Sequence, residues 1–157
     1  MKETLNLSAK IHFQITNIKK KTMNGTKEVI FYENVYDVGP ETCEYISDKG
    51  ILWSQNGLVE TSYPVGIKET KADECSLNQF WKKLDKIDIW SWKEKYVDEQ
   101  ANTCGHSWRL SLRNKAGKSK DIDGYEMYPH NFQKFINALN QLFQIKIEIE
   151  SEENDLV

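Results

Sequence analysis

Residues 107–143 read SWRLSLRNKAGKSKDIDGYEMYPHNFQKFINALNQLF, and two clear periodic patterns lie within this stretch. Residues 107–113 alternate strictly between polar and apolar side chains, which predicts a strand with one buried face. A turn at 114–118 contains Gly117. Residues 119–128 continue as a second alternating segment, so the two segments predict a β-hairpin.

A helix is predicted directly after this hairpin, from about residue 131 to residue 143. Pro129 suits a first helical turn, and Asn131 suits a cap. Apolar side chains then recur at intervals of three and four residues: Phe132, Phe135, Ile136, Leu139, Leu142 and Phe143. A helix with one wide apolar face must bury that face, and the neighbouring hairpin is the natural surface for it.

A second helix is predicted further toward the N-terminus, at about residues 76–88. Ser76 can cap it, because Gln79 follows at the spacing of a capping box. Phe80 and Leu84 continue at a helical interval. Residues 89–96 contain alternating aromatic side chains, which suit an extended segment as well as a helical one.

The N-terminal half is predicted to be β-structure. Residues 11–18 and 28–38 alternate between apolar and polar side chains, and Asn24-Gly25 is a turn signal, so these segments predict a hairpin. Residues 51–53 and 58–59 flank another Asn-Gly turn and predict a shorter hairpin. Residues 145–150 alternate isoleucine with charge and suit a short strand.

Together these elements predict an α+β fold, in which two or three hairpins form an antiparallel sheet and two helices pack on one face. Residues 1–147 are predicted to form a single domain. Residues 148–157 form an acidic tail that we expect to be disordered.

Composition narrows the classes of partner. The chain has 157 residues, a net charge of −3, a pI of about 5.7 and 21 Lys and Arg, of which only Arg109 and Arg113 are arginine. These values argue against a general nucleic-acid binder, which usually has a basic face. Three cysteines make no disulfide framework. Neither a signal peptide in residues 1–10 nor a long apolar span is visible, so we expect a cytoplasmic location without membrane contact.

Cys104 and His106 are the first candidates for chemistry. They lie two residues apart before the strand at 107–113, where they could bind a metal ion or form a thiol–imidazole pair. A zinc site needs three or four ligands, which Cys75 and either His12 or His130 would have to complete. Alternatively, Cys104 is an ordinary loop cysteine and His106 an exposed histidine, with no chemical role. We therefore expect no cofactor.

The aromatic side chains are the second group of candidates. Five tryptophans and seven tyrosines are many for this length. Some of them could form a platform for a partner protein, a base or a sugar, and the candidates are Trp53, Trp90, Trp92, Trp108 and Tyr125. Alternatively, the aromatic side chains fill the layer between helices and sheet.

The spaced aromatic residues also support a resemblance. The pattern over residues 80–142 includes W-x-W, Y, G-x-x-W-x-L, G and Y-P-x-x-F-x-x-F. The matching residues are Phe80, Trp81, Leu84, Trp90, Trp92, Tyr96, Gly105, Trp108, Leu110, Gly124, Tyr128, Pro129, Phe132, Phe135 and Leu139. This pattern resembles a family of uncharacterised bacterial proteins. The resemblance implies no assigned activity and no catalytic residues.

The sequence therefore favours a non-enzymatic protein-binding module, with an inhibitor or immunity-type protein acting on an intracellular partner as its more specific form. The alternative is a small enzyme or ligand-binding domain, with an aromatic-lined pocket that contains Cys104 and His106. Asp121 and Asp123, two residues apart, are weaker candidates for that chemistry and equally suit a solvated hairpin. The oligomeric state is not predicted.

Overall fold

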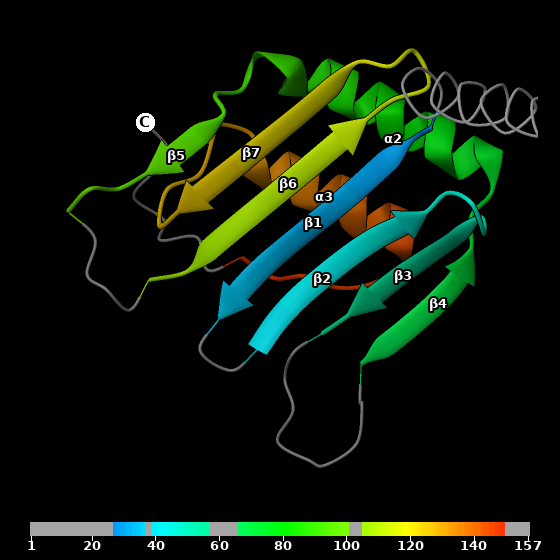
Figure 1. The fold of residues 1–157 in the computed structure, drawn as a ribbon, viewed down its shortest axis with the longest axis horizontal. Helices are drawn as coiled ribbons and strands as arrows, with labels where there is room; N and C mark the ends of the chain where they lie inside the picture. The colour runs from blue at the N-terminus through cyan, green and yellow to red at the C-terminus, as the bar shows by residue number, and fades with distance from the viewer. Residues whose placement is uncertain (1–26, 37–38, 57–65, 101–104, 150–157) are drawn as a thin grey trace, which may run out of the picture.

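A computed structural model describes residues 27–36, 39–56, 66–100 and 105–149 of the chain. Its elements in chain order are β1 (Val29–Tyr36), β2 (Gly39–Ile46), β3 (Ile51–Gln55), β4 (Ile67–Lys71), α2 (Glu74–Lys86), the short 3-10 helix η1 (Ile89–Ser91), β5 (Lys95–Val97), β6 (Ser107–Arg113), β7 (Ser119–Tyr125) and α3 (Phe132–Phe143). The strands form one sheet in the order β4-β3-β2-β1-β6-β7-β5 (Figure 1).

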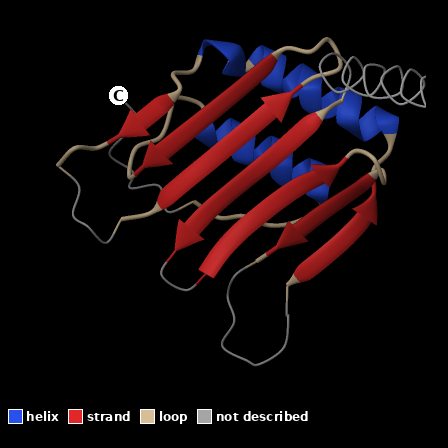
Figure 2. Ribbon diagram, viewed as in Figure 1, coloured by secondary structure: helices blue, strands red, loops and turns tan. Residues whose placement is uncertain are grey.

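The described sheet carries both α-helices on one face, which confirms the predicted α+β architecture (Figure 2). All neighbouring strands are antiparallel except β5, which runs parallel to β7. The strand at 107–113, its hairpin partner from residue 119 and the helix from residue 132 were all predicted correctly. The core lies between the helices and the sheet, with Leu110 and Leu112 from β6 packed among the buried residues of α3.

The predicted hairpin between residues 11–18 and 28–38 is wrong. β1 is bonded along one edge to β2 and along the other edge to β6, so no edge remains for another strand. Pro40 was interpreted as a strand end but lies inside β2, opposite Val35. Proline is tolerated there because it stands near the start of the strand. Residues 11–18 themselves lie outside the described residues.

Two other boundaries differ from the sequence prediction. β3 pairs with β4 and not with residues 58–59, which lie outside the described residues. Residues 145–149 form no strand, because the Asn140 side chain bonds both to the Ile147 amide (2.8 Å) and to its carbonyl (3.0 Å). Residues 150–157 of the predicted tail are not among the described residues.

The start of α2 also differs from the prediction. The cap is Asp73, whose carboxylate accepts hydrogen bonds from the Ser76 amide (2.9 Å) and from the Ser76 hydroxyl (2.7 Å). The predicted cap at Ser76 is therefore wrong, because Ser76 is the donor within the first turn. These hydrogen bonds favour the charged carboxylate and lower the pKa of Asp73.

Asp73→Ala is expected to lower the melting temperature at pH 7, whereas Asp73→Asn, which keeps an acceptor oxygen, should lower it less. A carboxyl group whose pKa is lower in the folded protein stabilises it only while ionised. The difference between wild type and Asp73→Ala should therefore shrink as the pH falls through the lowered pKa. Thermal unfolding followed by circular dichroism measures this, and an equal melting temperature at pH 7 would contradict a capping role.

Candidate functional site

The face of the sheet opposite the helices is not covered by any described helix (Figures 1 and 2). Successive side chains of a strand point to opposite faces, so the neighbours of the buried core residues point away from the helices. In β1 to β4 these side chains are Val29, Phe31, Glu33, Val35, Thr42, Glu44, Ile46, Ile51, Trp53, Gln55, Ile67, Glu69 and Lys71. We call this surface the uncovered face of β1–β4.

The centre of the uncovered face is a row of aromatic and acidic side chains. The strand register places Phe31 opposite Glu44, Glu44 opposite Trp53, and Trp53 opposite Glu69. Val35 and Ile67, away from the centre of the row, are 44% and 48% exposed. Cross-strand neighbours lie about 5 Å apart, so the row is a continuous surface of apolar rings and carboxylates.

The adjoining surface of β6 and β7 is polar and internally paired. Arg109 Nε donates to Asp123 Oδ1 (2.9 Å), and Ser111 Oγ donates to Asp121 Oδ1 (2.6 Å). The candidate carboxylates Asp121 and Asp123 therefore each have a cross-strand donor. This side of the sheet is therefore apolar and acidic on β1–β4, and polar with paired charges on β6–β7.

The tryptophans predicted as binding residues lie in different parts of the molecule. Trp92 and Trp108 are 6% and 2% exposed and lie in the core, where both contact Phe132. Trp53 is half-buried on the uncovered face. Trp90, also half-buried, stacks on Trp81 and donates to Asp85 (2.8 Å).

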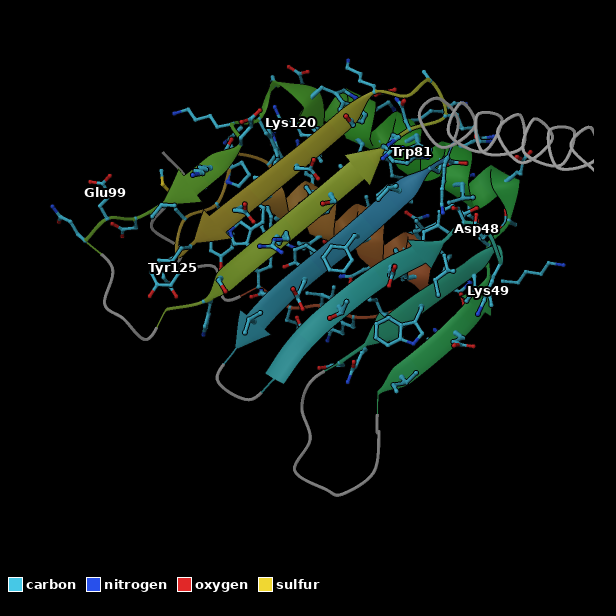
Figure 3. All side chains as sticks on the ribbon, in the orientation of Figure 1. Asp48, Lys49, Trp81, Glu99, Lys120 and Tyr125 are labelled. Atoms are coloured by element: carbon cyan, nitrogen blue, oxygen red, sulfur yellow. The ribbon has the colours of Figure 1, made fainter. Side chains whose placement is uncertain are left out.

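Tyr125 lies at the end of β7, where its hydroxyl accepts a hydrogen bond from the Gly105 amide (2.9 Å) (Figure 3). It is half-buried. The five predicted binding residues therefore do not form one platform, and of the tryptophans among them Trp53 is the one on the uncovered face. A binding role for each of the five stays a prediction.

Of the predicted Cys104/His106 pair, Cys104 lies outside the described residues. The backbone amide of His106 donates to the Glu126 carboxylate, and His106 Nδ1 lies 4.0 Å from Glu126 Oε1. Within the described ranges, no group of three or more His, Cys, Asp or Glu side chains is arranged to hold a metal ion. Cys75 is exposed at the start of α2.

Sequence reasoning missed Phe31 and Ile67 as surface residues and missed Glu41 entirely. Glu41 and Cys43 lie on the inward side of β2, where they line a cavity. Within residues 39–46 only Thr42 to Tyr45 alternate between polar and apolar side chains, which is too short a run to define a strand. The Gly39-Pro40 pair, interpreted as a strand end, also argued against a strand there.

The geometry defines an α+β protein whose sheet has one face covered by helices and one face with an apolar and acidic surface. The chain belongs to the family described as a domain of unknown function (DUF6438), whose profile matches residues 45–143, from the end of β2 to the end of α3. The chain has no significant match among curated proteins or among solved structures. No helix in the described ranges has the length and apolar character needed to span a membrane.

Proposed function

We propose that this chain is a non-enzymatic protein-binding module whose partner contacts the uncovered face of β1–β4. The observation that supports the proposal is the row in which Phe31 and Trp53 alternate with Glu44 and Glu69 on a sheet face that no described helix covers. Partly exposed aromatic side chains are the commonest anchors of protein interfaces. Apolar surface of this kind on a sheet also commonly marks an interaction site.

The charge of the face specifies the kind of partner. Three carboxylates, those of Glu33, Glu44 and Glu69, and one ammonium group, that of Lys71, lie among the apolar side chains of β1–β4, so this face has an acidic excess. Arg109, the nearest cation across the register from Glu33, is already paired with Asp123. The matching partner surface therefore has basic side chains around an apolar centre, because complementary charges speed association and exclude wrong partners.

An inhibitor or immunity-type function is the specific form that we propose for this module. A protein that acts on an anionic substrate has a basic binding surface, and an apolar and acidic sheet face is complementary to such a surface. Covering that surface would block access of the substrate. The partner in this form of the proposal is an intracellular enzyme with a basic active-site cleft.

Trp53→Ala is expected to weaken partner binding by about 2 kcal/mol or more, roughly thirtyfold in Kd, if Trp53 is an interface anchor. Glu44→Lys should weaken binding further through like-charge repulsion, and binding of the wild type should weaken with salt. The partner is first captured from an extract of the source cells. Calorimetry with the purified partner then measures the Kd of each variant.

The matched control is Ser119→Ala, a change at an exposed position of β7 on the polar part of the same sheet. It should leave the Kd unchanged. All variants are first compared by circular dichroism, so that loss of binding is not loss of fold. The proposal is wrong if every captured protein binds Trp53→Ala as tightly as wild type. It is also wrong if light scattering shows that the wild type is a homodimer and that the only effect of Trp53→Ala is to dissociate it.

A further inference from the structure

A cavity lies on the opposite, helix-bearing side of the same strands, between β2–β4 and residues 145–147. Its volume is about 340 Å³, near the lower end of the range for small-molecule sites. The polar groups that line it include Glu41, Cys43 and Ser54, and Ile145 and Ile147 supply apolar wall. Cys43 and Ser54 are buried and stand opposite one another in the register of β2 and β3.

The carboxylate of Glu41 is the unusual group in this cavity. Its Oε2 atom is buried and has no hydrogen-bond partner among the described residues. Burial raises the pKa of Glu41, because water is removed from the charged form. Burial also raises the pKa of Cys43 to about 12, with a contribution from repulsion by Glu41, so the thiol stays neutral.

Glu28 shows how this protein satisfies a buried carboxylate elsewhere. Glu28 is 9% exposed, accepts a hydrogen bond from Trp81 Nε1 (2.5 Å) and lies 4.0 Å from Lys115 Nζ. A buried polar group without a partner destabilises the folded protein, and it does so more strongly when it is charged. Among the described residues, Glu41 Oε2 has no counterpart of these two groups, so this oxygen is open to a ligand.

The lysines that line the cavity are engaged elsewhere. Lys68 Nζ donates to the backbone carbonyl of Gln144, and Lys146 pairs with Glu148 (2.7 Å). Neither hydrogen bond involves Glu41. A cation from outside is therefore the group that this cavity can accommodate beside its carboxylate.

We infer that this cavity binds a small organic cation, a primary ammonium or guanidinium group on a short apolar stem. The cation donates charge-assisted hydrogen bonds to Glu41, and the stem packs against Ile145 and Ile147. The Ser54 hydroxyl offers a second acceptor. The site lies on the face opposite Trp53 and does not depend on the protein-binding proposal, so either proposal can fail while the other holds.

The carboxylate should cost stability in the free protein. Glu41→Gln is expected to raise the melting temperature at pH 7 by about 2–4 °C. Because the pKa of Glu41 is raised on folding, wild-type stability falls as the pH rises from the ordinary value of 4.5 through the raised value. The advantage of Glu41→Gln should therefore vanish below pH 4.5. Cys43, Lys68 and Lys146 are the other titratable groups lining the cavity.

Binding is tested with three cationic probes: n-butylammonium, 2-phenylethylammonium and n-butylguanidinium. The neutral control is 2-phenylethanol, which has the same stem as the second probe. Affinities come from two-dimensional NMR titrations, which also show whether the shifted amides are those of Cys43, Ser54 and Ile147. We expect at least one cation to bind there, roughly tenfold or more tightly than the alcohol.

Glu41→Gln should weaken cation binding by the same factor. Glu44→Gln is the matched control, because Glu44 lies on the same strand but points to the uncovered face. It should leave the affinity unchanged. The inference is overturned if none of the three cations shifts these amides, if 2-phenylethanol binds as tightly as 2-phenylethylammonium, or if Glu41→Gln binds as tightly as wild type.

Discussion

Gly124→Ala is expected to destabilise the fold by about 3 kcal/mol. Gly124 in β7 stands directly opposite Trp108 in β6, and the indole ring of Trp108 lies over the glycine. A Cβ atom at Gly124 would lie 1.9 Å from Trp108 Nε1 and 2.0 Å from Cε2. These distances are far inside van der Waals contact, so the ring or the strand must move.

Trp108 has little freedom to move away. Its Nε1 donates to the backbone carbonyl of Met127 (2.9 Å), and its ring stacks on Tyr128 and Tyr96, with centroids 6.0 and 6.1 Å away. Displacing the indole would break this hydrogen bond and both ring contacts. The full cost of overpacking should therefore appear in the free energy of unfolding.

Urea denaturation of wild type and Gly124→Ala measures this cost. Gly50→Ala is the control, because a Cβ there meets nothing within 4 Å and only the left-handed backbone (φ 63°) is unfavourable. That change should cost about 1–2 kcal/mol. In a Trp108→Phe background the penalty of Gly124→Ala should shrink, since the phenyl ring is smaller. An equal cost in both backgrounds would show that the indole is not the obstacle.

Phe135→Ala is expected to cost about 3–5 kcal/mol of stability. Phe135 is fully buried on the sheet-facing side of α3. Its ring meets Tyr32 and Trp92 edge to face, with centroids 5.9 and 6.0 Å away. Removing the ring loses these contacts and opens a cavity between the helix and the sheet, where the neighbouring aromatic rings can relax only in part.

Since a domain is typically stable by only 5–15 kcal/mol, this loss should bring Phe135→Ala close to unfolding at ambient temperature. Urea denaturation is again the measurement. Lys134→Ala is the matched control on the same helix, because Lys134 is exposed and alanine is a good helix former. A loss below about 1 kcal/mol for Phe135→Ala would contradict its place at the centre of the core.

The two proposed sites use opposite faces of the same strands. Trp53 on β3 points to the uncovered face, and Ser54, the next residue, lines the cavity on the other side. Trp53→Ala therefore tests partner binding, and Glu41→Gln tests binding of a small cation. Each variant also serves as a control for the other site, provided that both remain folded.

Much of the architecture could be predicted from local patterns. The alternation in residues 107–113, the hairpin that follows and the helical periodicity from Phe132 to Phe143 all correspond to observed elements. These predictions succeeded because the side-chain period of a strand and that of a helix can each be recognised within a short segment of sequence. An apolar helix beside an alternating hairpin also implies that the helix packs on the sheet.

The partner of each strand could not be predicted from such local patterns. The sequence offered residues 11–18 as the partner of β1, whereas the structure places β2 and β6 on its two edges. Paired residues of β1 and β6 are 72 to 84 positions apart, about half of the chain, and no local signal selects one alternating segment over another. The parallel addition of β5 to β7 is equally non-local.

The candidate sites also divide into properties that the sequence predicts and properties that depend on the tertiary structure. The amino-acid sequence alone determines that the chain is α+β, that its helices have one apolar face each and that its net charge is −3, because these properties depend on short-range periodicity and composition. Which tryptophans are buried depends on the tertiary structure. The register of the strands places Trp53 beside two carboxylates. The packing of residues 145–147 against the strands encloses the cavity in which Glu41 Oε2 has no described partner. These are long-range contacts, and they exist only once the sheet has assembled.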